Sequence, residues 1–136
     1  MMPAYPQPRE DRDNREFLAA WRQGRLLVQL CGSCGRSFFY PRPLCPHCWS
    51  EDVRFEEIDG RGEVVSFSLV HRPNQPAFLG EVPIVLAEIR LPTDITLIAR
   101  IVGARPDAMR TGLAVELVSA SEAARYPLPT FRLRAG

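Results

Sequence analysis

The clearest chemistry in this 136-residue sequence lies in four cysteines arranged as two pairs. Cys31 and Cys34 form a first CxxC motif, and Cys45 and Cys48 form a second one after ten intervening residues. Two such pairs on separate turns bring four sulfurs to one centre, and Gly35 permits the sharp turn after the first pair. The spacing therefore predicts a tetrahedral metal site, with zinc as the preferred ion and iron as the alternative.

The predicted metal site is structural rather than catalytic, because four protein thiolates fill a tetrahedral shell. His47 lies between the second pair of cysteines and is expected to stay outside that shell. The alternative interpretations are a redox dithiol or disulfides, but a redox CxxC normally occurs alone beside a βαβ unit. The N-terminal sequence has no apolar leader, which favours a cytoplasmic, reducing location where metal binding is commoner than disulfides.

The elements around the cysteines are short, and residues 25–59 are interpreted as one zinc ribbon module. Residues 25–30 and 53–58 have the composition of strands that flank the motif. The aromatic residues Phe38, Phe39, Tyr40 and Trp49 are expected to wrap the metal turns. This segment has too few apolar residues to fold unaided, so metal binding must supply stability that the core cannot.

Residues 60–136 show the alternation of apolar and polar side chains that is typical of half-buried strands. Five short stretches carry the pattern: Val65, Phe67 and Leu69; Val85, Ala87, Ile89 and Leu91; Ile95, Leu97, Ala99 and Ile101; Val115 and Leu117; Phe131 and Leu133. Five strands in this length favour a small Greek-key barrel of the OB-fold type, with an SH3-like barrel as the second choice. The predicted fold class is mainly β: an N-terminal helix, a rubredoxin-like zinc ribbon and a five-stranded OB-fold barrel.

Residues 1–24 are interpreted as an N-terminal arm and a short helix. The first twelve residues are rich in proline and charge and are expected to be flexible. A helix is predicted to begin after Asp13 or Asn14 as the capping residue and to end at Gly24. Its apolar residues Phe17, Leu18 and Trp21 share one face, which is expected to dock on the rest of the chain.

The composition argues against several classes of function. Every one of the 17 basic residues is arginine, which excludes Schiff-base chemistry and a P-loop lysine in this sequence. The net charge is +1, and no apolar stretch is long enough to span a bilayer, so neither nucleic acid nor membrane is an expected partner. An OB-fold nucleic-acid binder stays as the alternative function, although its usual basic and aromatic groove is thin here.

The loop after the first predicted barrel strand is the candidate surface for a ligand or partner. It places His71 and Arg72 before a proline-stiffened apolar segment that contains Phe78. Arg72 can bind a phosphate, Phe78 can cover an apolar chain, and Phe67 is expected on the inward face beneath them. A lone histidine such as His71 is more often structural than catalytic, and no other catalytic group is expected.

The order of motifs resembles the acyl-CoA-associated OB-fold proteins that carry an N-terminal rubredoxin-like zinc ribbon. The matching stretches are FLAAW (17–21), GRL (24–26), CGSCG (31–35), YPRP (40–43), CPHC (45–48), GRGEVVSF (60–67), VHRP (70–73), VP (82–83), the glycine at 112, and LPTFR (128–132). Pro83-Ile84 departs from the Pro-Tyr pair that is common in that family.

This resemblance implies a non-catalytic accessory protein. Members of the family accompany thiolase-like or lipid-transfer-protein-like enzymes that act on acyl-CoA, and the barrel is thought to help hold the CoA ester. The expected function is therefore an accessory subunit that binds acyl-CoA or scaffolds such an enzyme, with one structural zinc ion.

Overall fold

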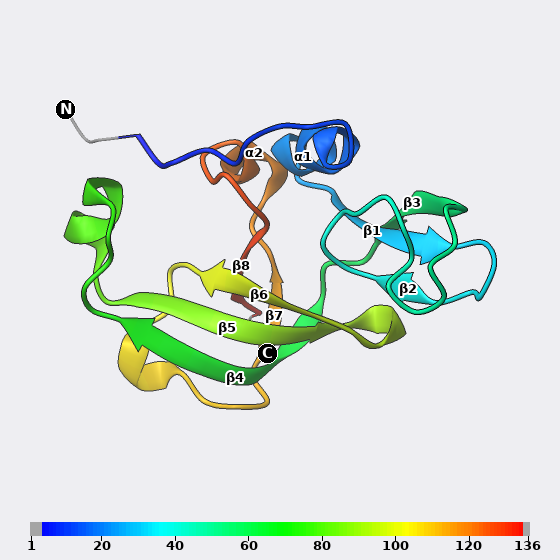
Figure 1. Ribbon diagram of the computed structural model, residues 1–136. Coiled ribbons are helices and arrows are strands. Elements are labelled where there is room, and N and C mark those ends of the chain that lie inside the picture. Colours follow the sequence, from blue (N-terminus) through cyan, green and yellow to red (C-terminus); the bar gives the residue numbers. More distant parts are fainter. Residues whose placement is uncertain (1–3, 135–136) are drawn as a thin grey trace.

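The computed structural model describes residues 4–134, which form a small three-stranded sheet, a β-barrel and two helices (Figure 1). Helix α1 (Arg15–Arg22) leads into the sheet, whose strand order is β2-β1-β3. Its strands are β1 (Leu26–Cys31), β2 (Ser37–Phe38) and β3 (Val53–Ile58). The metal motif thus lies on a separate sheet, beside the barrel and directly after the first helix.

The C-terminal strands close into a five-stranded barrel of order β4-β5-β6-β8-β7. They are β4 (Gly62–Val70), β5 (Ile84–Leu91), β6 (Ile95–Ile101), β7 (Ala114–Leu117) and β8 (Thr130–Leu133). Three short 3-10 helices, η1 (Pro76–Glu81), η2 (Pro92–Asp94) and η3 (Pro106–Ala108), and helix α2 (Ala120–Ala123) occupy the connections. This strand order is that of an OB-fold, so the predicted fold class is confirmed.

The barrel closes through a short parallel contact between β6 and β8. Only Arg100 with Thr130 and Ile101 with Phe131 pair between these strands, and the N–H of Val102 donates to the Phe131 carbonyl at 2.9 Å. The residues just before Thr130 include Pro127 and Pro129. Proline has no N–H to donate to a strand ladder, so the pairing cannot extend backwards from Thr130.

The apolar faces of the barrel strands pack into one core, as the alternation predicts. The strand residues at its centre are Val64, Val85, Ala87, Ile89, Leu91, Leu97, Ile101, Val115 and Phe131. Strand β4 differs from the prediction, because an irregularity between Val64 and Ser66 shifts its register against β5. Val64 is consequently buried in place of the predicted Val65. Phe67 pairs with the buried Ala87, as expected for the inward face, but is 37% exposed.

The exposure of Phe67 has a structural cause in the barrel closure. It pairs with Ala87 of β5, but β7 reaches only Gly62 and Glu63 on the other side of β4. The second half of β4 therefore extends beyond the closed part of the barrel, where fewer side chains cover its inner face.

Helix α1 docks on its own chain, as predicted. Phe17 and Leu18 join the barrel core, while Trp21 packs with Val118 and Ala123. The Trp21 indole N–H also donates to the Tyr126 carbonyl at 2.9 Å. Gly24 follows the helix with φ of +81°, a conformation that favours glycine and ends the helix as expected.

The four aromatic residues near the cysteines do not form one cluster, and this prediction is wrong. Phe38 alone packs with Cys31 and Cys45. Phe39 turns towards the barrel and meets Phe17 edge to face at 5.5 Å, while Tyr40 and Trp49 are 52% and 78% exposed. The metal motif is therefore wrapped on one side only.

No helix within residues 4–134 combines the length and apolar character needed to cross a lipid bilayer.

We expect Trp21→Ala to lower the free energy of unfolding by about 3–5 kcal/mol, because it removes a fully buried ring and orphans a carbonyl. Trp49→Ala is the matched control, since its ring is 78% exposed and should change stability by less than about 0.5 kcal/mol. Urea unfolding of both variants measures the difference. Equal losses would mean that α1 does not depend on this contact.

Candidate functional site

The four cysteine sulfurs gather at one point, as the spacing predicts. All four Sγ atoms lie within 4.8 Å of one another, with 3.5 Å between Cys31 and Cys48 and 3.7 Å between Cys34 and Cys45. Ligands of a tetrahedral zinc ion, each about 2.3 Å from the metal, are about 3.8 Å apart. A disulfide would need about 2.05 Å. The cluster therefore fits one tetrahedral metal ion and not a pair of disulfides.

Backbone N–H groups donate hydrogen bonds to the two buried cysteine sulfurs. The N–H groups of Cys34 and Ser33 each donate to Cys31 Sγ at 3.4 Å, and that of His47 donates to Cys45 Sγ at 3.3 Å. The bond from Cys34 is the main reason why the pKa of the Cys31 thiol lies below its ordinary value. Thiolates are the form that binds metal, so this turn favours the metal-binding form of Cys31. At Cys48 a backbone hydrogen bond at Ser50 works to lower the pKa, but the contact with Cys31 and burial outweigh it and raise that pKa to about 12.

The His47 side chain lies outside this cluster. Its imidazole is exposed, and Nδ1 lies 3.4 Å from a guanidinium nitrogen of Arg36. Gly35 has φ of +76° after the first pair, whereas the matching position after the second pair is Trp49, with φ of +66°. The second turn thus holds a bulky residue in a conformation that glycine adopts more easily.

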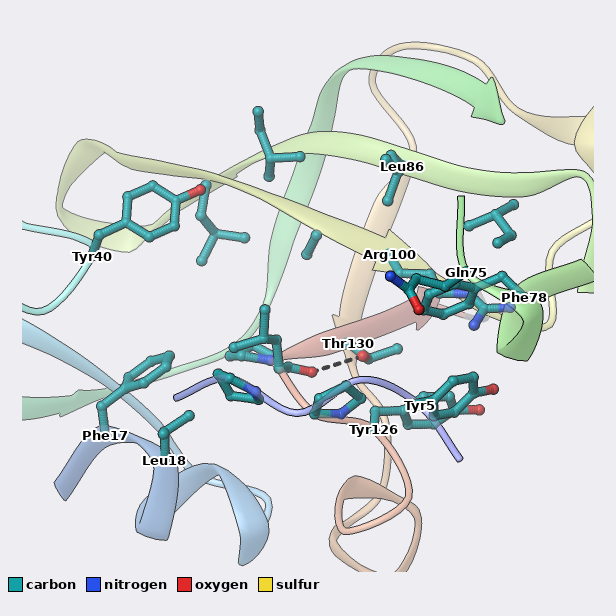
Figure 2. A pocket seen from close by; sticks show the side chains of 18 of the residues that line it. Tyr5, Phe17, Leu18, Tyr40, Gln75, Phe78, Leu86, Arg100, Tyr126 and Thr130 are labelled. Atoms are coloured by element: carbon teal, nitrogen blue, oxygen red, sulfur yellow. Dashed lines mark hydrogen bonds between the residues drawn. The ribbon is translucent and has the colours of Figure 1, made fainter. Parts of the chain in front are cut away.

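A second feature, an apolar cavity of about 540 Å³, lies between the barrel, helix α1 and the segment before β8 (Figure 2). Its walls come from segments that lie far apart in the sequence: Phe17 and Leu18 of α1, Phe39 and Tyr40 of the ribbon, Leu86 of β5, and residues 97–100 of β6. Residues 127–130 form the facing wall. A cavity of this size and apolar character is typical of a binding site.

Tyr5 closes one end of this cavity. Its ring stacks on Phe78 at 5.2 Å and on Tyr126 at 6.1 Å, and its hydroxyl donates to both Glu81 carboxylate oxygens at 2.7 and 2.8 Å. Arg100 donates to the same carboxylate at 2.8 Å. Figure 2 shows Tyr5, Phe78 and Arg100 together at this end, with Tyr40 towards the other.

Burial works to raise the pKa of Glu81, but the Tyr5 hydroxyl and Arg100 outweigh it and leave that pKa below its ordinary value. Burial and the bond to Glu81 raise the pKa of the Tyr5 phenol. The raised pKa of Tyr5 and the lowered pKa of Glu81 reflect the same arrangement. The neutral Tyr5 phenol donates to the ionised Glu81 carboxylate, which also pairs with Arg100. The charges of Arg100 and Glu81 therefore cancel within the cavity wall.

The predicted ligand surface consists of Phe67, His71, Arg72 and Phe78, and the fold does not gather all four around one cavity. Phe78 lines the cavity and lies 6.0 Å below the Arg100 guanidinium carbon. His71 and Arg72 are exposed at the end of β4 and do not line it, and neither does Phe67.

Sequence reasoning missed the contributions of Tyr5, Glu81 and Arg100. The arm was expected to be flexible, yet Tyr5 bonds to Glu81, 76 positions away in the sequence. Residues 1–3 of that predicted arm lie outside the described residues. The one available signal is an aromatic residue directly before Pro6 in an arm rich in proline and charge.

Two family models match the chain in the order of its two β units. One, described as "ChsH2, rubredoxin-like zinc ribbon domain", covers residues 18–54. The other, described as "ChsH2, C-terminal OB-fold domain", covers residues 55–119. Among curated proteins, a "DUF35 domain-containing scaffold protein" of Methanocaldococcus jannaschii is 34% identical over 77% of each chain. The chain belongs to the ChsH2 (DUF35) family.

Other ChsH2-like relatives are larger or carry other names. A protein of Thermomonospora curvata, named "Probable enoyl-CoA hydratase alpha subunit", is 37% identical over 93% of this chain, which spans only 39% of that relative's length. The "Benzoylsuccinyl-CoA thiolase subunit BbsA" of Thauera aromatica is 31% identical over 75% of this chain and 70% of its own.

A chain of one solved structure matches most of this fold. It comes from the structure titled "Ltp2-ChsH2(DUF35) aldolase" and is 36% identical, with a TM-score of 0.78, over 93% of this chain and 98% of its own. A second structure, of a DUF35 family protein from Sulfolobus solfataricus, has a TM-score of 0.63 at 22% identity and supports the fold alone.

We expect the purified chain to hold one metal ion and Cys34→Ser to lose most of it. Residues 25–58 should then unfold while the barrel, which has its own core, keeps much of its β-structure. Ser33→Ala, the matched control, changes a neighbouring hydroxyl that bonds Ser50 and should retain the metal. Elemental analysis with circular dichroism measures both. Folded, reduced protein without stoichiometric metal would contradict the assignment.

We expect Tyr5→Phe to destabilise the chain by about 1–3 kcal/mol at neutral pH, because a hydrogen bond to a carboxylate is lost. The pKa of Glu81 is lowered in the folded state. The ionised Glu81 carboxylate therefore contributes to the free energy of unfolding at neutral pH, and this contribution is lost as the pH falls through the folded pKa. The difference from wild type should therefore shrink on acidification. Tyr40→Phe, whose ring is half exposed, should show no such pH dependence.

Proposed function

We propose that this chain is a non-catalytic accessory subunit that scaffolds a thiolase-like or aldolase-type enzyme acting on acyl-CoA. The observation that carries the proposal is the match, at 36% identity over 98% of its length, to a chain in the structure titled "Ltp2-ChsH2(DUF35) aldolase". The relatives named scaffold protein and thiolase subunit support the same role. The reacting groups then belong to the partner enzyme.

The chemistry of the chain agrees with a scaffold. Its four thiols are engaged in one cluster, for which we propose zinc as the resident ion, in keeping with the zinc ribbon description of the family. The sequence has no lysine and only two histidines, of which His47 lies beside Arg36 and His71 is exposed at a strand end. A metal with four protein thiolates has no open position for substrate, so it supplies stability to the ribbon.

Direct binding of acyl-CoA is the second part of the proposal. Arg72 is exposed beside the apolar loop and is able to donate paired hydrogen bonds to a phosphate. Phe78 is half-buried in the same loop as Arg72 and offers an apolar ring to an uncharged acyl group. His71 and Phe67 lie on the same strand end and complete the proposed surface.

The scaffold role is tested by co-expression with each thiolase-type protein encoded in the same genome. We expect one of them to form a stoichiometric complex whose turnover of acyl-CoA depends on this chain, while this chain alone has none. Size-exclusion chromatography and a CoA-release assay measure both. Turnover by the isolated chain, or the absence of any complex, would overturn the proposal.

The acyl-CoA part is tested separately. Arg72→Ala and Phe78→Ala should each weaken acyl-CoA binding by the assembled complex about tenfold to a hundredfold, with metal content unchanged. Arg105→Ala is the matched control, because the exposed guanidinium of this arginine donates to Asp107, two residues away. Calorimetric titration measures the affinities. Equal affinities in all three variants would place the acyl-CoA elsewhere.

A further inference from the structure

The cavity follows the open edge of a barrel strand. Four consecutive residues, 97–100 of β6, line it, and so do the five consecutive residues 126–130. Side chains alternate between the faces of a strand, so a cavity that meets every residue in a run lies along the edge. The two runs diverge from the point where Arg100 pairs with Thr130.

The backbone of β6 has unpaired groups on this edge. The N–H of Val102 points to β8, where it donates to the Phe131 carbonyl. Backbone groups of successive residues in a strand point to opposite edges. Every second residue back from Val102, and so Ile98 and Thr96, therefore directs its N–H and C=O to the edge that carries β8. Leu97 directs its N–H and C=O to β5. Among the described residues, no strand pairs with β6 on that side before Arg100.

The prolines on the opposite wall keep this edge open. Pro127 and Pro129 have no N–H, so the segment before β8 cannot pair fully with β6. The free edge of residues 95–99 is about 16 Å long at a strand rise of about 3.3 Å per residue. It is long enough for an extended segment of about five residues.

The walls of the cavity select an uncharged and largely apolar occupant. Arg100 is the only cationic side chain among the lining residues within positions 4–134, and Glu81 already neutralises it at 2.8 Å. The apolar side chains of Ile98 and Leu128 are 63% and 50% exposed, although both line the cavity. A ligand rich in phosphates would need unpaired cations, which the described residues lining this cavity do not offer. Exposed apolar side chains around it instead favour contact with the apolar surface of a protein partner.

We infer that an extended, uncharged segment of the partner enzyme adds to the free edge of β6 as a further strand. Its amides pair with the backbone of Thr96 and Ile98, and its apolar side chains enter the cavity between α1 and residues 127–129. Strand addition of this kind draws affinity from backbone hydrogen bonds and specificity from side-chain pockets. The inference rests on the scaffold role proposed above and says where and how the partner is held.

Hydrogen exchange of the wild-type complex tests the inference. The complex with the thiolase-type partner identified by co-expression is incubated in D₂O, separated at low pH, and read amide by amide by NMR. We expect the Ile98 amide to exchange at least tenfold more slowly in the complex than in the free chain. The Leu97 amide, which faces β5 in both states, serves as the internal reference.

A pair of variants tests the same bond by removing it. Ile98→Pro deletes an N–H that makes no hydrogen bond to another strand of the described barrel, so the fold should persist. Affinity for the partner should fall at least tenfold, because the proposed bond to the partner segment is lost. Ile98→Val keeps the N–H and a similar side chain, so affinity should stay within about threefold of wild type. Circular dichroism and metal content confirm the fold of both variants.

Three results would overturn the inference. A complex in which the Ile98 amide exchanges as in the free chain would place the partner elsewhere, while leaving the scaffold role intact. Protection of Ile98 by CoA alone would assign the edge to the amides of the CoA arm instead. If no thiolase-type protein forms a complex, the scaffold role and this inference both fail.

Discussion

The shape of the molecule depends on how little of β6 pairs with β8. Two residue pairs close the barrel, and the prolines at 127 and 129 stop the contact from growing longer. Had this pairing continued, the segment before β8 would lie against β6, and the cavity would be filled by the chain itself. The short closure instead leaves a wedge that α1, the ribbon and the Tyr5 segment surround (Figure 1, Figure 2).

The two β units are stabilised differently: the barrel by its apolar core and the ribbon by its metal ion. The barrel has a continuous apolar core to which α1 contributes Phe17 and Leu18. The ribbon has a cluster of Phe38 with two buried cysteines, too small to hold the fold without an ion. Phe39 connects the two by its contact with Phe17, so an ion that orders the ribbon also fixes one wall of the cavity.

The sequence was sufficient for the fold class, because regular patterns carry local information. The CxxC spacing predicted the sulfur cluster, and period-two alternation predicted all five barrel strands. Val65 was misplaced because an irregularity between Val64 and Ser66 puts Val64 inside instead, and alternation alone does not locate it. Phe67 keeps the inward face but is exposed because β7 does not reach this half of β4, which is a property of the barrel closure rather than of the local sequence. The contacts of Tyr5 and Arg100 with Glu81 could not be predicted from the sequence. They form only when segments distant in the sequence fold together, and nothing in the local sequence specifies them.

The most direct test of this account is the structure of the chain bound to its thiolase-type partner, determined by crystallography or electron cryo-microscopy. The account predicts an extended partner segment along β6, hydrogen-bonded to the backbone of Ile98, with the reacting groups on the partner and the four-cysteine cluster away from the substrate. A partner that contacts the barrel only elsewhere, with solvent between β6 and residues 127–129, would contradict it.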